Sequence, residues 1–221
     1  MTSFLSQNYS HHPNFSGFSP ALGSDAQLLN QFGFIPGLQD LLLVRQVHAL
    51  EHATIWILNG ARPPLTLTVT SYRRYSLTRS DDGQLGGLST PQGFYLTGDI
   101  TLQALKRASA LALKRLNGGE WDLAIHPRCG TNMSVTLALT AGFSLAAHAL
   151  TPNRPLDHML GLGAAAVAAA ALTPPAGAIA QRYLTTAIPT NLAIKTIYPI
   201  YHDNSESRPR QHFVQVEWID A

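Results

Sequence analysis

The pattern of apolar and polar positions along the 221-residue chain predicts two soluble-type helices. Residues 38–58 are strongly apolar at helical spacing, and Asn59 and Gly60 end that segment. A second helix is expected over residues 101–117, because apolar residues recur there at helical spacing and basic residues lie on the opposite face. Two glycines follow and end this helix. Asp99 is a candidate for the start of this helix.

Shorter β-prone runs predict strands around these helices. Residues 65–78 alternate as LTLTVTSY, and residues 86–100 combine a glycine pair, a proline-containing turn and the run FYL, which indicates a β-hairpin. Residues 120–125 are expected to add one short strand. Residues 191–221 contain two further β-like runs separated by a polar loop, which predicts a C-terminal β-hairpin.

Two stretches, residues 133–153 and 159–181, contain no formally charged residue. Each is long enough to cross about 30 Å of hydrocarbon, so the pattern predicts a two-helix transmembrane hairpin. A buried hairpin in a soluble protein is the alternative, because alanine is weakly hydrophobic and Pro174 and Pro175 interrupt the second stretch. Neither stretch has the polar face that a soluble core helix normally carries, which favours the membrane.

The expected fold class is therefore α+β, in four parts. Residues 1–37, rich in Ser, Asn, Gly and Pro, are expected to form a disordered arm without a cleavable signal peptide. Residues 38–132 form a small α/β region that carries the metal-site helix described below. Residues 133–181 are the transmembrane hairpin, and residues 182–221 form a β-hairpin segment that packs on the α/β region.

Charge narrows the possible partners. The formal net charge is only +2 and no basic cluster exceeds a pair of neighbouring residues, so we do not expect a nucleic-acid partner. Basic residues flank the two uncharged stretches on their outer sides, which predicts that both termini and the metal site face the cytoplasm. The expected partners are the lipid bilayer and a membrane protein or an interfacial molecule as substrate.

The helix at residues 38–58 contains the most informative motif, H-x-x-E-H, formed by His48, Glu51 and His52. Residues three and four apart share one face of a helix, so both imidazoles can reach a single ion. This order is the inverted zincin motif, in which two histidines hold zinc and the glutamate acts as general base. A third ligand has to come from elsewhere. The alternative is that these histidines bind no metal and only occupy a solvent-exposed edge of the core.

The second motif is HPRCGTN, residues 126–132. His126 and Cys129 lie three apart around a proline, a spacing that lets one turn present two ligands to one ion, and histidine with cysteine favours zinc. Cys129 is the only cysteine, so an internal disulfide is excluded. The alternative is a buried structural thiol beside a loop histidine.

With both motifs, HALEH at 48–52 and HPRCGT at 126–131, the chain resembles an uncharacterised membrane-protein family, a domain of unknown function common in photosynthetic bacteria. It is also distantly similar to the YqhQ-type family, described as predicted metal-dependent enzymes, which pairs these motifs immediately before membrane helices. The resemblance implies an integral membrane protein that binds a metal through His48, His52 and the His126/Cys129 turn. Three positions differ from the YqhQ-type pattern, so no substrate carries over: Ala53, Asn132 and Met133.

Two functions fit these residues. The first is a membrane-bound zinc hydrolase that acts on a peptide or amide bond, with three protein ligands, an open fourth position and Glu51 as general base. In that case Arg128 or Asn132 would stabilise an oxyanion, with Thr131 as a further supporting residue.

The second is a metal-stapled membrane scaffold or assembly factor. Here His48, His52, His126 and Cys129 would all bind zinc and complete its tetrahedron, and Glu51 would only orient a histidine.

Overall fold

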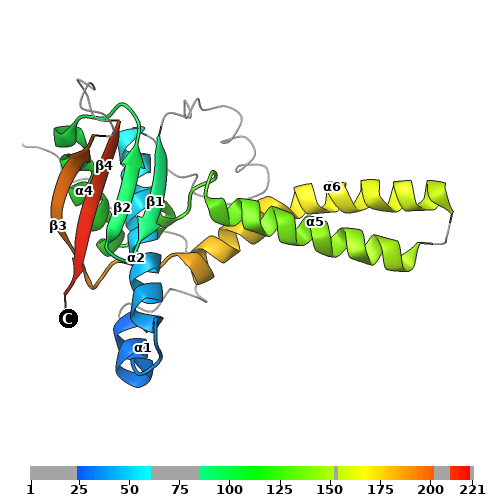
Figure 1. Ribbon diagram of the computed structural model, residues 1–221, viewed down its shortest axis with the longest axis horizontal. Coiled ribbons are helices and arrows are strands. Elements are labelled where there is room, and N and C mark those ends of the chain that lie inside the picture. Colours follow the sequence, from blue (N-terminus) through cyan, green and yellow to red (C-terminus); the bar gives the residue numbers. More distant parts are fainter. Residues whose placement is uncertain (1–23, 61–84, 152–153, 202–209, 220–221) are drawn as a thin grey trace, which may run out of the picture.

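The structure is a computed structural model that describes residues 24–60, 85–151, 154–201 and 210–219. Its elements form an α+β body from which two long helices project side by side as a hairpin (Figure 1). This arrangement confirms the predicted fold class. The strand expected at residues 65–78 lies outside the described residues.

Helix α2 (Leu38–Leu58) lies at the centre of the body and has the bounds expected from the sequence. Most of its side chains between Leu42 and Trp56 are buried. A helix that is apolar on nearly all sides has to be covered on nearly all sides. The sheet, helix α4 (Leu102–Asn117) and the turn before the hairpin provide that cover. Helix α2 is therefore a firmly packed support for the histidine motif that it carries.

An antiparallel sheet of four strands, in the order β1-β2-β4-β3, packs against α2. Its strands are β1 (Gly86–Thr90), β2 (Gly93–Thr97), β3 (Leu192–Ile200) and β4 (Gln211–Trp218). Both predicted β-hairpins are confirmed. Strand β2 pairs with β4, so the two hairpins form one continuous sheet. Phe94, Leu96 and Val214 contribute from this sheet to the core that surrounds α2.

Two local predictions after the first hairpin are wrong. Helix α4 begins after Thr101, whose hydroxyl accepts a hydrogen bond from the Ala104 N–H, and not at Asp99. The segment expected as a strand at residues 120–125 is a short 3-10 helix, η1 (Trp121–Ala124). The backbone carbonyls of Ala124 and Ile125 accept hydrogen bonds from side chains of α2, so they are not available for pairing in a sheet.

Part of the expected disordered arm is helical, because residues 24–32 form helix α1 (Ser24–Phe32), while residues 1–23 lie outside the described residues. The buried carboxylate of Asp25 accepts hydrogen bonds from Arg45 at 3.4 Å and from Gln46 at 3.2 Å. A helix of nine residues is only marginally stable alone. Helix α1 is therefore stabilised by contacts with α2, twenty residues further along the chain. The composition of residues 1–37 could not reveal these contacts.

Helices α5 (Gly130–Leu150) and α6 (Pro155–Ala180) form the predicted helical hairpin, and α6 continues into a π-helical turn, η2 (Gln181–Thr185). By length and composition, α5 and the Pro155–Thr185 segment could each cross a membrane. The buried side chains in the middle of α6 are small, Ala165 and Ala169.

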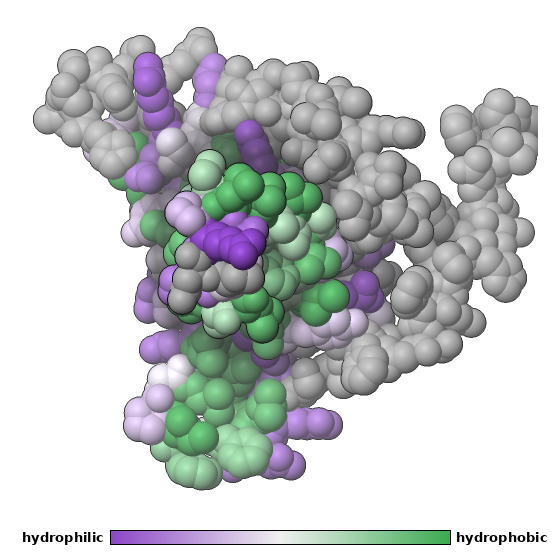
Figure 2. Space-filling model, turned by 90° about the vertical axis from the view of Figure 1, so that its right-hand side faces the viewer, coloured by the Kyte–Doolittle hydropathy of each residue, from purple (hydrophilic) through white to green (hydrophobic). Residues whose placement is uncertain are grey.

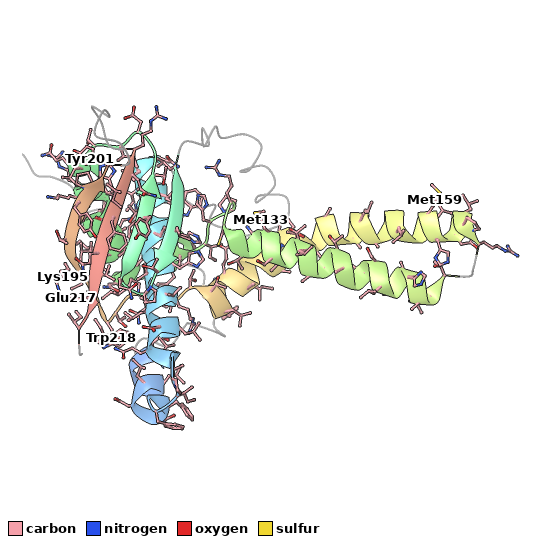
Figure 3. All side chains as sticks on the ribbon, viewed as in Figure 1. Met133, Met159, Lys195, Tyr201, Glu217 and Trp218 are labelled. Atoms are coloured by element: carbon pink, nitrogen blue, oxygen red, sulfur yellow. The ribbon has the colours of Figure 1, made fainter. Side chains whose placement is uncertain are left out.

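The larger apolar side chains of the hairpin point outward and are exposed, including Met133, Leu137, Leu145, Leu150, Leu156, Met159, Leu160 and Val167. Figure 3 shows the outward sticks along both helices, with Met133 at the end next to the body and Met159 near the far end. Helix α6 bends as it returns to the body (Figure 1), and it contains Pro174 and Pro175, which remove backbone donors.

A buried network of amides fastens the hairpin to the body. Asn132 at the start of α5 donates to the Pro127 carbonyl at 2.6 Å and accepts from Gln181 at 2.9 Å. Gln181 in turn accepts the His126 backbone N–H at 2.8 Å. Gly177 of α6 lies directly against this network, since a Cβ added there would be 2.0 Å from Oδ1 of Asn132.

Replacing Gly177 with alanine should displace the Asn132 amide and break its hydrogen bond with Gln181. Crowding of this kind typically costs about 1–3 kcal/mol of folding free energy. We expect a lower thermal midpoint for the detergent-solubilised Gly177→Ala variant than for the wild type.

Gly163→Ala is the matched control, because Gly163 is on the same helix and a Cβ there would meet nothing within 4 Å. It should leave the midpoint unchanged or slightly raised, since alanine favours helix over glycine. Equal midpoints for Gly177→Ala and Gly163→Ala would contradict the packing described here.

Candidate metal centre

The candidate centre is built on the face of α2 that turns toward the base of the hairpin. Nδ1 of His48 is 3.0 Å from the Thr185 carbonyl oxygen, and Nδ1 of His52 is 2.6 Å from the Ala124 carbonyl oxygen. A carbonyl only accepts, so each Nδ1 carries the proton and donates it. The Nε2 atom of each histidine is left with a lone pair, which is the form that binds a metal.

Cys129 lies immediately before α5 and caps it, since its Sγ accepts a hydrogen bond from the Thr131 backbone N–H. The same sulfur is 3.3 Å from Nε2 of His48. Burial by itself raises the pKa of the thiol, but hydrogen bonds with His52 and Thr131 outweigh it, so the pKa is lowered overall. A lowered pKa favours the thiolate, which is the ligand form of cysteine.

Together His48, His52 and Cys129 form a compact donor set, in which the ligand atoms lie within 4.8 Å of one another. Tetrahedral zinc, with bonds of 2.0–2.3 Å, separates neighbouring ligand atoms by about 3.5 Å. The spacing and the donor types therefore fit zinc. Burial lowers the pKa of His52, which keeps this imidazole neutral and able to bind.

Glu51 is buried beside these residues, at 5% exposure. Its carboxylate accepts a hydrogen bond from the hydroxyl of Ser89, and Gly87 of β1 lies so close that a Cβ there would be 2.0 Å from Oε1. Burial raises the pKa of Glu51, although the hydrogen bond from Ser89 acts against that rise. A carboxylate with a raised pKa is a stronger base than an exposed one.

His126 is near the centre but outside the three-residue donor set. Its ring lies 5.6 Å from that of His52 and 5.0 Å from that of Trp56, measured between centroids. Its Nδ1 accepts the Arg128 backbone N–H at 3.3 Å, which favours the ring proton on Nε2 and occupies the Nδ1 lone pair. Burial, with the charge of Arg128, lowers its pKa to about 3 and keeps it neutral.

The residues expected to assist catalysis have structural contacts. Both polar atoms of the Asn132 amide bind protein partners at the base of the hairpin, which argues against the expected role in stabilising an oxyanion. Thr131 contacts Cys129 and, at 3.1 Å, the hydroxyl of Thr185. Arg128 is exposed in the same turn.

Sequence reasoning missed the groups that orient the ligands. The sequence does not reveal the role of the Ala124 and Thr185 carbonyls, because every residue has a carbonyl. Only the tertiary structure determines where each carbonyl points. Ser89 and Gln181 were also missed. Gln181, at the end of the second uncharged stretch, is the one whose polarity could have drawn attention.

Comparisons with known proteins identify the family of the chain. The family model described as Domain of unknown function (DUF6391) matches residues 43–197, which include all three donors. An uncharacterized protein of Picosynechococcus sp. (strain ATCC 27264 / PCC 7002 / PR-6) is 46% identical over 204 residues, covering 92% of this chain and 94% of that protein. No solved structure matches the chain. An uncharacterised family of this kind was expected, while the relation to the YqhQ-type family stays a prediction.

Removing any one of the three donors should abolish stoichiometric metal binding, because two ligands hold zinc far more weakly than three. We expect His48→Ala, His52→Ala and Cys129→Ser to lose bound zinc, measured as metal per chain by mass spectrometry after purification of the full chain in detergent.

The matched control is His126→Gln, which removes the fourth candidate ligand. It should retain the zinc of the wild type, because the Nδ1 atom of His126 accepts a backbone N–H. Loss of zinc from a folded His126→Gln variant would contradict the three-residue site and support the four-ligand one.

Proposed function

This chain belongs to the DUF6391 family, and we propose that it is a membrane-anchored zinc hydrolase acting on a peptide or amide bond at the membrane surface. The observation that carries the proposal is the orientation of the two histidines. Backbone carbonyls hold both Nδ1 atoms, so both Nε2 atoms are available beside the only thiol of the chain.

The number of donors found among the described residues supports an enzyme over a scaffold. Three protein ligands are typical of catalytic zinc sites, whose fourth position is open, while structural sites are closed by four. The tautomer of His126 argues against a fourth ligand from that residue. Zinc held by this set would supply Lewis-acid activation of water and of a carbonyl group.

Glu51 is the residue we assign as general base. It is buried within one helical turn of His48 and next to His52 in the sequence, and its carboxylate lies against strand β1. The Ser89 hydroxyl fixes one oxygen of the carboxylate. A carboxylate with a raised pKa can accept a proton from water and return it to the leaving group.

The hairpin supports a membrane location. Its large apolar side chains are exposed along both helices, which is costly in water and favourable in lipid. Both ends of the hairpin join the same body, so a membrane crossed by the hairpin would leave the body on one side (Figure 1). The basic residues that flank the uncharged stretches favour the cytoplasm for that side.

Glu51→Gln should retain zinc, because the carboxylate is not among the donors, but lose hydrolysis by about 10²- to 10⁴-fold. The measurement is zinc-dependent cleavage of a fluorogenic peptide library by the full chain in lipid nanodiscs. Undiminished cleavage by Glu51→Gln would overturn Glu51 as the general base. No cleavage by zinc-loaded wild type would overturn the hydrolase and leave the scaffold.

Displacing the carboxylate without removing it gives an independent test. In Gly87→Ala the new methyl group would collide with Glu51, whereas in Gly86→Ala it would meet nothing within 4 Å. We expect Gly87→Ala to keep zinc and lose most of the cleavage, and Gly86→Ala to behave as the wild type. Equal cleavage by the two variants would count against a catalytic Glu51.

A further inference from the structure

An exposed apolar cluster lies where α1 turns into α2. We name it the α1 corner and define it by residues whose side chains are 36% to 81% exposed: Leu28, Phe32, Phe34, Ile35 and Leu41. Phe34 is the most exposed, at 81%. Only one formally charged residue, Asp40, occurs between residues 26 and 44. An apolar surface of this kind, with so little charge around it, indicates an interaction site.

The α1 corner is held next to the base of the hairpin. The guanidinium of Arg45 binds the buried Asp25 carboxylate of α1 at 3.4 Å. The same guanidinium donates to the carbonyls of Tyr183 and Thr186, at 3.4 and 3.3 Å, where the chain leaves the hairpin. One side chain therefore connects α1 with the end of η2.

The exposed apolar surface continues across this junction. Ile179, Tyr183 and Leu184, at the body end of the hairpin, are 60%, 43% and 70% exposed. Figure 2 looks along the hairpin toward the body, and its lower part shows the apolar patch over α1 on the face from which the hairpin emerges. The patch and the outward surface of the hairpin therefore belong to one side of the molecule.

We propose that the α1 corner is an interfacial anchor that inserts into the headgroup and upper acyl region of the bilayer. The proposal rests on the membrane location given under Proposed function. Interfacial amphipathic helices bury their apolar side chains about 5–10 Å into this region. Tyrosine is enriched at the same depth, which fits Tyr183 beside the corner.

This anchor would control the height and tilt of the metal centre above the lipid. The α1 corner lies at the start of α2 and the two histidines lie in the middle of the same helix, so insertion of the corner would also set the position of the histidines. The centre would then face a substrate bond at the lipid surface, and not one deep in the cytoplasm.

Depth can be measured by placing tryptophan at Phe34 in the full chain. The Phe34→Trp variant is reconstituted in phosphatidylcholine vesicles that carry a nitroxide quencher either high on the acyl chain or near its end, and the emission of the wild type is subtracted. We expect a larger loss of emission with the shallow quencher. The substitution is conservative at a largely exposed position, so folding should be retained.

Two matched variants test the interfacial anchor separately from the membrane location on which it rests. Tyr201→Trp, at the end of β3 on the part of the body away from the hairpin (Figure 3), should lose little emission with either quencher. Leu145→Trp, within α5, should be quenched by the deep label if the hairpin crosses the membrane.

The outcomes are distinct. Quenching of Leu145→Trp without quenching of Phe34→Trp would overturn the anchor and leave the membrane location intact. A blue-shifted but unquenched Phe34→Trp would show that protein covers the corner, either a second copy or residues outside the described ranges, and would also overturn the anchor. An unquenched Leu145→Trp would overturn the membrane location itself.

Discussion

The structure depends on two hydrogen bonds between imidazoles and backbone carbonyls, His52 with Ala124 and His48 with Thr185. Each joins the central helix α2 to a segment more than seventy residues away. One segment leads into the hairpin and the other leads out of it, so both ends of the hairpin are fastened to the same two turns of α2. Because the carbonyls take the Nδ1 protons, the same bonds that hold the hairpin in place also leave both Nε2 atoms ready for a metal. Fold and candidate site therefore share their contacts.

The junction has to satisfy many polar groups in a buried space. The first N–H groups of α5 and the last carbonyls of the hairpin have no partners within their own helices. The sulfur of Cys129 caps α5, while Asn132 and Gln181 bind each other and the backbone of the turn that contains His126. This places one polar, rigid layer between the apolar hairpin and the apolar core of the body. A metal ion in that layer would stabilise it further, since binding to the folded state adds to folding free energy.

A buried glutamate next to three metal donors is energetically unfavourable unless something compensates for its burial. The Ser89 hydroxyl does so only in part, and the pKa of Glu51 stays raised. Strand β1 closes over this carboxylate at Gly87, so the first β-hairpin belongs to the candidate site and not only to the scaffold of the sheet. A buried carboxylate whose pKa is raised by burial marks a candidate functional site.

Local patterns in the sequence determined the bounds of α2, both β-hairpins and the two long apolar helices, because periodicity and turn residues act over a few neighbours. They also determined that His48 and His52 share a face and that Cys129 precedes a helix, so most of the donor set could be predicted. The tertiary structure alone decided that residues 120–125 turn as a 3-10 helix, that Asp25 and Arg45 stabilise α1, and that His126 points its lone pair at a backbone N–H. In each case the outcome depends on a partner, either a backbone group or a side chain. The direction or position of that partner follows from how the whole chain packs. No short stretch of sequence contains that information.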